Sequence, residues 1–194
     1  NYAPITSEYL TYDEVLTHSD YDLNTPASAV QENNGLGTLV SDAFLWADRT
    51  LNAAYADSPH TVSVTADGVL RANLPAGDLT VAMAFDVLSM GVGEDGTSGF
   101  PLVAVYLTGK ELRTAAEIDA SVSDFMTTAR LYCSGLNFTY NPHRLLLNKV
   151  TDVYLVKDGQ RVELQDDKLY RIVADLYSGQ MLSAVTDMSY GILS

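Results

Sequence analysis

The side chains that could bind a metal ion are scattered along this sequence rather than gathered in a motif. Its three histidines, His18, His60 and His143, are far apart, and none lies in an H-x-x-x-H or H-x-E pattern. The glycine-rich segment 91–99 contains two acids but lacks the alternating oxygen ligands of a calcium loop. We therefore predict no metal site and no bound cofactor in this chain.

Nucleophilic catalysis and phosphate binding also lack their sequence signatures. No G-x-S-x-G motif is present, and the single cysteine, Cys133, lies within an apparent strand, where a thiol is usually buried and unreactive. Neither G-x-x-x-x-G-K-[ST] nor G-x-G-x-x-G occurs between a strand and a helix. The sequence therefore predicts no catalytic residue in this chain.

The elements that would position a site follow from the spacing of apolar residues. A wide apolar stripe predicts a helix from about residue 35 to 54, and Thr80 is expected to cap a short helix. Residues 102–107 are predicted to form a buried strand that leads into another helix. A last helix is expected to carry Met181. Strands are expected over residues 61–65, 131–140, 149–156, 161–164 and 170–174. This order predicts an α+β fold with a mixed, largely antiparallel sheet and flanking helices.

Composition and charge disfavour some classes of binding partner. The chain has 194 residues and a formal net charge of −14, so nucleic-acid polymers and anionic bilayers meet net repulsion. No apolar run approaches the roughly 20 residues that a membrane span needs. Residues 1–31 show no periodicity and are expected to be an extended lead-in from another domain, with the folded domain over residues 32–194.

The order of short motifs resembles the C-terminal domain of the 5'-nucleotidase family. Residues 32–43 are similar to the helix signature that opens this domain, and residues 65–71 are similar to a strand and turn that end in an arginine. Residues 107–112 match its L-T-G-x-E-L segment, and residues 134–138 match S-G-L-x-F. The other similar segments, in family order, are 75–80, 85–91, 149–153 and 169–173.

This resemblance implies the substrate-recognition domain of a two-domain hydrolase that acts on nucleotides or related phosphoesters. The family implies that a pair of divalent metal ions and the catalytic groups belong to a preceding N-terminal metallophosphatase domain. The isolated chain is then expected to be inactive, and its expected partners are that domain and a small nucleotide. A bacterial protein at an extracellular, periplasmic or cell-surface location is also implied.

By the same resemblance, Arg71 takes the position of an arginine that contacts substrate phosphate or carboxylate. A planar guanidinium can hold such an oxyanion through two hydrogen bonds. The alternative for Arg71 is a surface arginine paired with Asp67 or Asp78. Asp175 is expected to accept hydrogen bonds from a sugar or base, and helix capping is its alternative.

The family stacks the base between two aromatic rings, and here the sequence departs from it. Met90 replaces the first ring, Val92 replaces an asparagine, and the late loop lacks its paired glycines and terminal aromatic residue. A thioether can pack against a ring, and Tyr177 could supply a flat face, so both are candidate base contacts. A second hypothesis therefore stays open, in which a non-catalytic domain binds protein or glycan and has lost nucleotide recognition.

Overall fold

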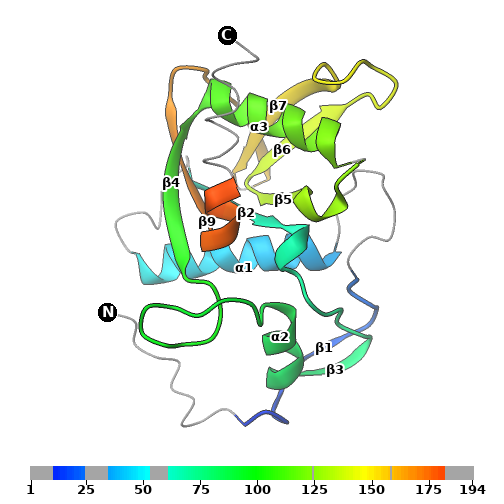
Figure 1. Cartoon of the computed structure of the whole chain (residues 1–194), viewed down its shortest axis with the longest axis vertical. Coiled ribbons are helices and arrows are strands. Elements are labelled where there is room, and N and C mark those ends of the chain that lie inside the picture. Colours follow the sequence, from blue (N-terminus) through cyan, green and yellow to red (C-terminus); the bar gives the residue numbers. More distant parts are fainter. Residues whose placement is uncertain (1–10, 25–34, 53–60, 124, 158, 182–194) are drawn as a thin grey trace.

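The structure is a computed structural model that describes residues 11–24, 35–52, 61–123, 125–157 and 159–181 (Figure 1). Its helices are α1 (Gly35–Leu51), α2 (Val81–Val87) and α3 (Gly109–Val122), with short 3-10 turns η2 (Asp67–Val69) and η3 (Thr127–Ala129). Its strands are β1 (Val15–Ser19), β2 (Thr61–Ala66), β3 (Gly77–Thr80), β4 (Leu102–Thr108), β5 (Leu131–Ser134), β6 (Leu136–Tyr140), β7 (Val150–Lys157), β8 (Gln160–Glu163) and β9 (Leu169–Asp175).

The strands form a central sheet and two smaller ones. In the four-stranded sheet, with order β4-β9-β2-β5, β2 and β9 are parallel and the outer strands are antiparallel to their neighbours. Strands β6, β7 and β8 form an antiparallel sheet, and β1 pairs with β3. The predicted α+β class with a mixed, largely antiparallel arrangement is confirmed.

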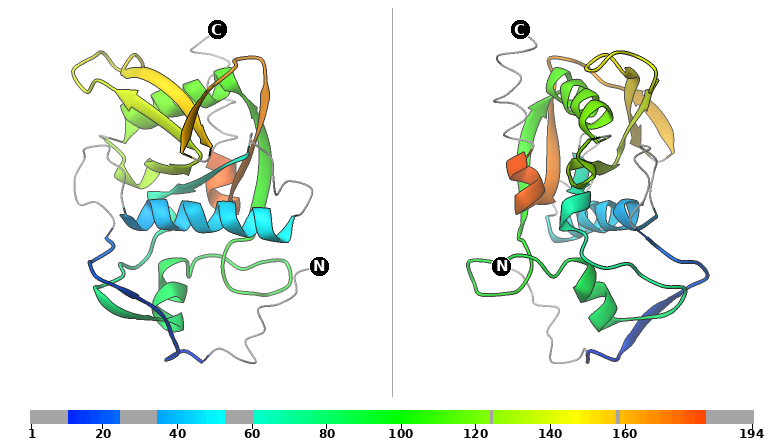
Figure 2. Two further views of the ribbon diagram at one scale, coloured as in Figure 1. Left: turned by 180° about the vertical axis from the view of Figure 1, so that it is seen from behind. Right: turned by 45° about the vertical axis from the view of Figure 1, so that its right-hand side comes forward.

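Helix α1 lies across the central sheet because its apolar stripe is buried there (Figures 1 and 2). Leu36, Val40 and Phe44 are buried in one hydrophobic cluster, which Tyr132 of β5 also joins. Burying one such side chain contributes about 1.5–3 kcal/mol. Gly37 allows this approach, since a Cβ atom there would lie 2.2 Å from the Tyr132 ring.

Two helix starts behave as their sequences predict. The Thr80 side chain accepts a hydrogen bond of 3.4 Å from the Met83 backbone nitrogen at the start of α2. Thr108 and Glu111 form a capping box at the start of α3, in which each side chain accepts from the other residue's backbone nitrogen. Such caps each contribute about 1 kcal/mol.

Three predicted elements differ in the structure. The expected strand 131–140 is divided into β5 and β6, because Gly135 adopts a φ of 84° and directs the chain into a different sheet. Strand β4 was expected to be buried, but it lies at the edge of its sheet and is partly exposed. A helix begins at Leu176 and is described as far as Met181, and the rest of the expected last helix lies outside the described residues.

Part of the expected lead-in packs on the rest of the molecule. Strand β1 pairs with β3, and Leu23 is buried and joined to Leu74 by two backbone hydrogen bonds. With α2, these strands form a layer on the far side of α1 from the central sheet (Figures 1 and 2). Residues 11–24 therefore belong to the packed unit, and the domain boundary at residue 32 stays a prediction.

Candidate functional site

A cavity of about 230 Å³ lies where β9 ends and β4 begins, between the central sheet and the layer that contains α2. Met90 and Asp175, which are distant in sequence, both line it. The other lining residues come from α1, η2 and the segment between α2 and β4: Phe44, Val69, Leu88, Ser98, Gly99 and Phe100. The structure thus brings two of the four predicted site residues together.

The carboxylate of Asp175 is buried and already hydrogen-bonded. One oxygen accepts from the Ser178 backbone nitrogen at 2.8 Å. The other accepts from the Ser178 hydroxyl at 2.6 Å and from the Thr65 hydroxyl at 3.4 Å. Asp175 therefore caps the helix that begins at Leu176, which was the alternative role considered for it, while it also lines the cavity.

Tyr177 contacts the site through Phe100, a lining residue that the sequence did not indicate. Its side chain stacks on Phe100, with 6.1 Å between ring centroids and 25° between ring planes. The Phe100 ring also packs closely on Gly91, where a Cβ atom would lie 2.4 Å from it. The only sequence signal for Phe100 was an aromatic residue at the end of a glycine-rich segment.

The segment 91–99 folds back on itself beside the cavity. The Gly99 backbone nitrogen donates to the Gly91 carbonyl at 3.0 Å, and the Gly93 nitrogen donates to the Thr97 carbonyl at 2.8 Å. Gly91 and Gly99 both have positive φ, of 87° and 106°, which glycine adopts without strain. This turn brings Ser98 to the wall of the cavity, whereas Val92 is exposed.

Arg71 is exposed, and its backbone nitrogen donates to the Val87 carbonyl at 2.9 Å, next to the lining residue Leu88. The two acids considered as surface partners bind elsewhere: Asp67 accepts from the Tyr132 hydroxyl at 2.8 Å, and Asp78 contacts His18 at 2.8 Å. Within the described part of the chain, no side chain pairs with the Arg71 guanidinium.

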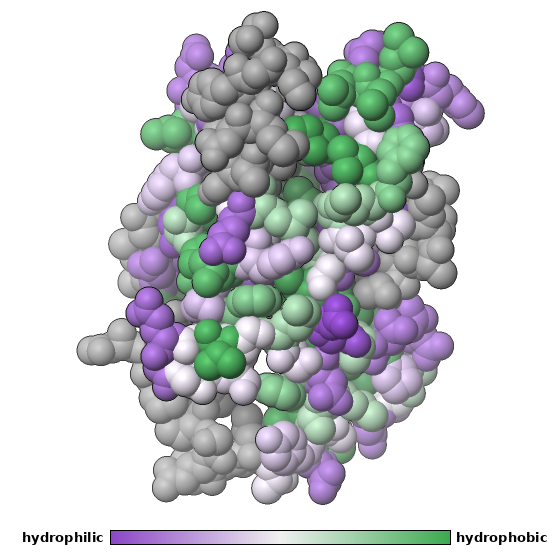
Figure 3. Space-filling view, viewed as in Figure 1, coloured by the Kyte–Doolittle hydropathy of each residue, from purple (hydrophilic) through white to green (hydrophobic). Residues whose placement is uncertain are grey.

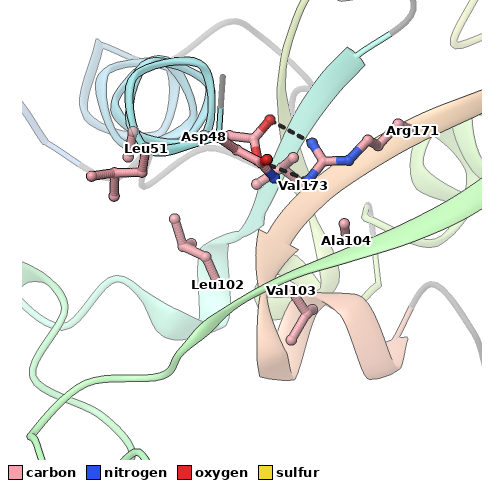
Figure 4. Close-up of a pocket in the computed structure, with 9 residues that line it drawn as sticks. Asp48, Leu51, Leu102, Val103, Ala104, Arg171 and Val173 are labelled. Atoms are coloured by element: carbon pink, nitrogen blue, oxygen red, sulfur yellow. Dashed lines mark hydrogen bonds and ion pairs between the residues drawn. The ribbon is translucent and has the colours of Figure 1, made fainter. Parts of the chain in front are cut away.

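A second cavity, of about 280 Å³, lies between the C-terminal half of α1 and strands β4 and β9 (Figure 4). Asp48 and Arg171 meet there in an ion pair with two hydrogen bonds, one of 2.8 Å from Arg171 Nη2 to Asp48 Oδ1. Both side chains are only 8% exposed. The sequence does hold two signals for this pair that were missed. They are an acid on the apolar face of a predicted helix and an arginine within an apolar strand.

Two further titratable groups are shifted by burial. Desolvation raises the pKa of the Cys133 thiol to about 12, so the thiol is protonated at neutral pH. Desolvation also raises the pKa of Asp119 to about 7, against the lowering effect of the Leu131 backbone nitrogen and the Arg130 charge. Among the described residues, no group of three His, Cys, Asp or Glu side chains could hold a metal ion, and no helix could cross a membrane.

The sequence matches a family model described as the 5'-nucleotidase C-terminal domain over residues 15–184. That match includes most of the chain, from β1 to beyond β9. The chain therefore belongs to this family, as the resemblance of its motifs predicted. A comparison with curated protein sequences gave no match.

Solved structures show the same fold at low sequence identity. The 5'-nucleotidase precursor of Thermus thermophilus is similar over 90% of this chain, with 24% identity and a TM-score of 0.72. The NAD nucleotidase of Haemophilus influenzae is similar over 93%, with 16% identity and a TM-score of 0.63. A putative 5'-nucleotidase of Staphylococcus aureus is similar over 90%, with 15% identity and a TM-score of 0.58. The chain spans 32% of the length of each of these proteins.

Proposed function

We propose that this chain is the nucleotide-recognition domain of a two-domain, metal-dependent phosphoester hydrolase of the 5'-nucleotidase type. The carrying observation is the cavity that Met90 and Phe100 line, together with the Tyr177 ring that stacks on Phe100. Family membership supports the class of substrate, because the similar solved proteins are named as nucleotidases.

The stacked rings suit a planar nucleobase. A base held between two rings needs a ring separation of roughly 7 Å, twice the ~3.4 Å rise between stacked bases. Phe100 and Tyr177 stack on each other with centroids 6.1 Å apart, so a base can lie between them only after one ring moves away. Tyr177 is the ring free to move, since it is 41% exposed, whereas Phe100 is held against Gly91. The thioether of Met90 gives the base a further soft apolar contact.

Arg71 is proposed to bind the anionic end of the ligand. The chain has a net charge of −14, so an anion reaches this surface only where a cation acts locally. The guanidinium of Arg71 has no partner among the described residues, and its planar donors match a phosphate or carboxylate.

The chemistry of hydrolysis is assigned to the expected N-terminal domain. A pair of divalent metal ions there would stabilise the attacking and leaving oxygens of the phosphate ester. In this proposal the present chain only binds and orients the nucleoside end, so the purified chain releases no phosphate when divalent metal is added. We further propose that the parent is a bacterial protein that acts outside the cytoplasm.

Calorimetry of the purified chain tests the proposal with nucleosides, nucleotides and nucleotide sugars. Arg71→Gln is expected to weaken nucleotide binding about tenfold, the value of one charge-assisted contact, and to leave nucleoside binding unchanged. Arg49→Gln, which removes an exposed arginine from the last turn of α1, is the matched control. Absence of heat with every ligand at about millimolar concentration, where even weak sites are occupied, would contradict the proposal.

The second candidate is a domain that keeps this fold and binds protein or glycan instead. The saturated carboxylate of Asp175 favours it, because both oxygens are engaged inside the protein and offer a ligand little. The two candidates differ in one measurement. If adding a nucleoside changes the chemical shifts of the Phe100 and Tyr177 ring protons in an NMR spectrum, the result supports nucleotide recognition. Unchanged chemical shifts support the alternative.

A further inference from the structure

The loop that joins β6 to β7, residues 141–149, ends in an exposed apolar tip. Leu145 is 80% exposed and Leu146 is 59% exposed. The loop stands out from the upper end of the molecule, and strongly hydrophobic residues gather over it (Figures 1 and 3). Adjacent exposed leucines at a loop tip mark an interaction surface more often than scattered apolar residues do.

The tip is held rigidly by side chains of α3. The Ser121 hydroxyl accepts from the Leu147 backbone nitrogen at 2.9 Å. The Glu117 carboxylate accepts from the backbone nitrogens of Lys149 and Val150, at 2.6 Å and 2.8 Å. These hydrogen bonds fix the C-terminal part of the loop to α3.

The backbone is also strained at this place. Leu147 has a φ of 59°, and it is the one residue other than glycine with positive φ in the described part of the chain. A leucine in this region costs about 1 kcal/mol, since its Cβ atom approaches the following carbonyl oxygen. Strain that keeps apolar side chains in solvent indicates a function for their exposure.

The charge of the loop is opposite to that of the chain. Residues 141–149 contain His143, Arg144 and Lys149 and no acid, whereas the whole chain carries −14. Lys149 is buried, so His143 and Arg144 are the basic groups at the surface of the loop. Charges are screened over about 8 Å at physiological salt, so the Arg144 guanidinium acts locally at the tip.

We infer that this tip is a contact site for a phospholipid surface, into which Leu145 and Leu146 insert while Arg144 stays with the lipid phosphates. Apolar side chains flanked by basic groups are the composition that binds at the boundary between headgroups and acyl chains.

Shape favours lipid over protein at this surface. A projecting tip buries little area against a second copy of itself, whereas a stable protein interface needs about 1,200 Å². A bilayer accepts a convex apolar tip without a complementary groove. The inference does not depend on nucleotide binding, because the loop and the cavity lie at opposite ends of the central sheet (Figure 1).

Sedimentation of the whole chain with phosphatidylcholine vesicles tests the inference. Wild-type protein is expected to bind at about millimolar lipid, since a few buried aliphatic groups give weak, reversible binding. The variant Leu145→Ser/Leu146→Ser is expected to bind at least about tenfold more weakly. Leu39→Ser, which changes an exposed leucine on α1, is the matched control and should bind as wild type. Wild-type protein that stays in the supernatant, as a protein partner would predict, overturns the inference.

Fluorescence gives an independent readout of insertion. The chain has one tryptophan, Trp46 on α1, so the background Trp46→Phe removes intrinsic emission. In that background, the emission of a Leu145→Trp variant is expected to shift to the blue on adding vesicles. Emission that is unchanged while the protein sediments with vesicles would place the contact elsewhere and overturn the inference for this loop.

Discussion

The ring of Tyr177 stacks, with centroids 6.1 Å apart and planes at 25°, on the ring of Phe100, which lines the same cavity as Met90 and Asp175. The family motifs have an aromatic residue where this chain has Met90. By that comparison, this chain lacks one of the two rings that stack on the base. Phe100 lines the same cavity as Met90 from ten positions further along, because the turn 91–99 returns the chain to the cavity, and we propose that it supplies the missing ring.

We expect Phe100→Leu and Tyr177→Leu each to weaken nucleoside binding. Stacking of a base on an aromatic side chain contributes about 1–3 kcal/mol, so each loss is about tenfold or more. Tyr106→Leu, on the exposed face of the edge strand β4, is the control and should leave affinity unchanged. Calorimetry with adenosine and uridine measures the effect. Equal affinities for all three variants would show that neither ring contacts the base.

Gly91→Ala should disturb the site through Phe100. A Cβ atom at Gly91 would lie 2.4 Å from the Phe100 ring, which must then move. Gly96→Ala separates this contact from backbone strain, because Gly96 has a similar φ of 80° and no atom within 4 Å of its added Cβ. Both variants should lose about 1 kcal/mol of stability from the positive φ, but only Gly91→Ala should also lose ligand affinity. Equal affinities in the two variants would contradict a positioning role for Gly91.

Local signals explain which parts of the fold were predictable. The cap at Thr80 and the start of α3 depend on residues within one turn, and α1 depends on one stripe of apolar side chains, so the sequence predicted all three. The division of residues 131–140 depends on Gly135, whose role emerges only when two sheets compete for the same chain. The edge position of β4 likewise depends on strand order, which the apolar content of one segment does not encode.

The residues of the candidate site also fall into a predicted group and a missed group. Met90, Asp175 and Tyr177 were predicted from motif order; the structure brings Met90 and Asp175 to one cavity, and Tyr177 contacts its lining residue Phe100. Phe100 was missed because its contact with Tyr177 depends on the path of a glycine-rich turn. Asp48 and Arg171 were missed because pairing between a helix and a strand far along the chain has no fixed sequence spacing.

Asp48→Asn should destabilise the protein strongly. The pair of Asp48 and Arg171 is buried, and removing the carboxylate takes away a buried charge partner of the guanidinium, at a cost of about 3–5 kcal/mol. Arg171→Met/Asp48→Leu removes both charges, so it should be considerably more stable than the single variant. Arg161→Met, which breaks an exposed pair with Asp152, is the surface control and should change stability little. Urea unfolding of the four proteins measures these differences, and a single variant as stable as the double one would contradict the argument.

Asp119 should make the stability of the fold depend on pH. Burial raises its pKa from 3.8 to about 7, so between these values the native state holds a proton that the unfolded chain has released. Stability from this group is complete below pH 3.8 and decreases as pH rises through the window to about 7. The total loss is on the order of 4 kcal/mol, because a tenfold change in a proton-binding constant corresponds to about 1.4 kcal/mol.

Asp119→Asn isolates this contribution, because an amide has no proton to lose and its oxygen can still accept from the Leu131 backbone nitrogen, which lies 3.0 Å from the Asp119 carboxylate in the wild type. Urea unfolding at a series of pH values should give two curves that separate as pH rises, with the variant gaining on the wild type between about pH 4 and 7. The other carboxylates titrate alike in both proteins and cancel in the difference. Asp95→Asn, which changes an exposed carboxylate whose pKa is lowered by the Thr97 backbone nitrogen, should show no such gain. Parallel curves for Asp119→Asn and wild type would mean that Asp119 is ionised in the folded protein throughout this range.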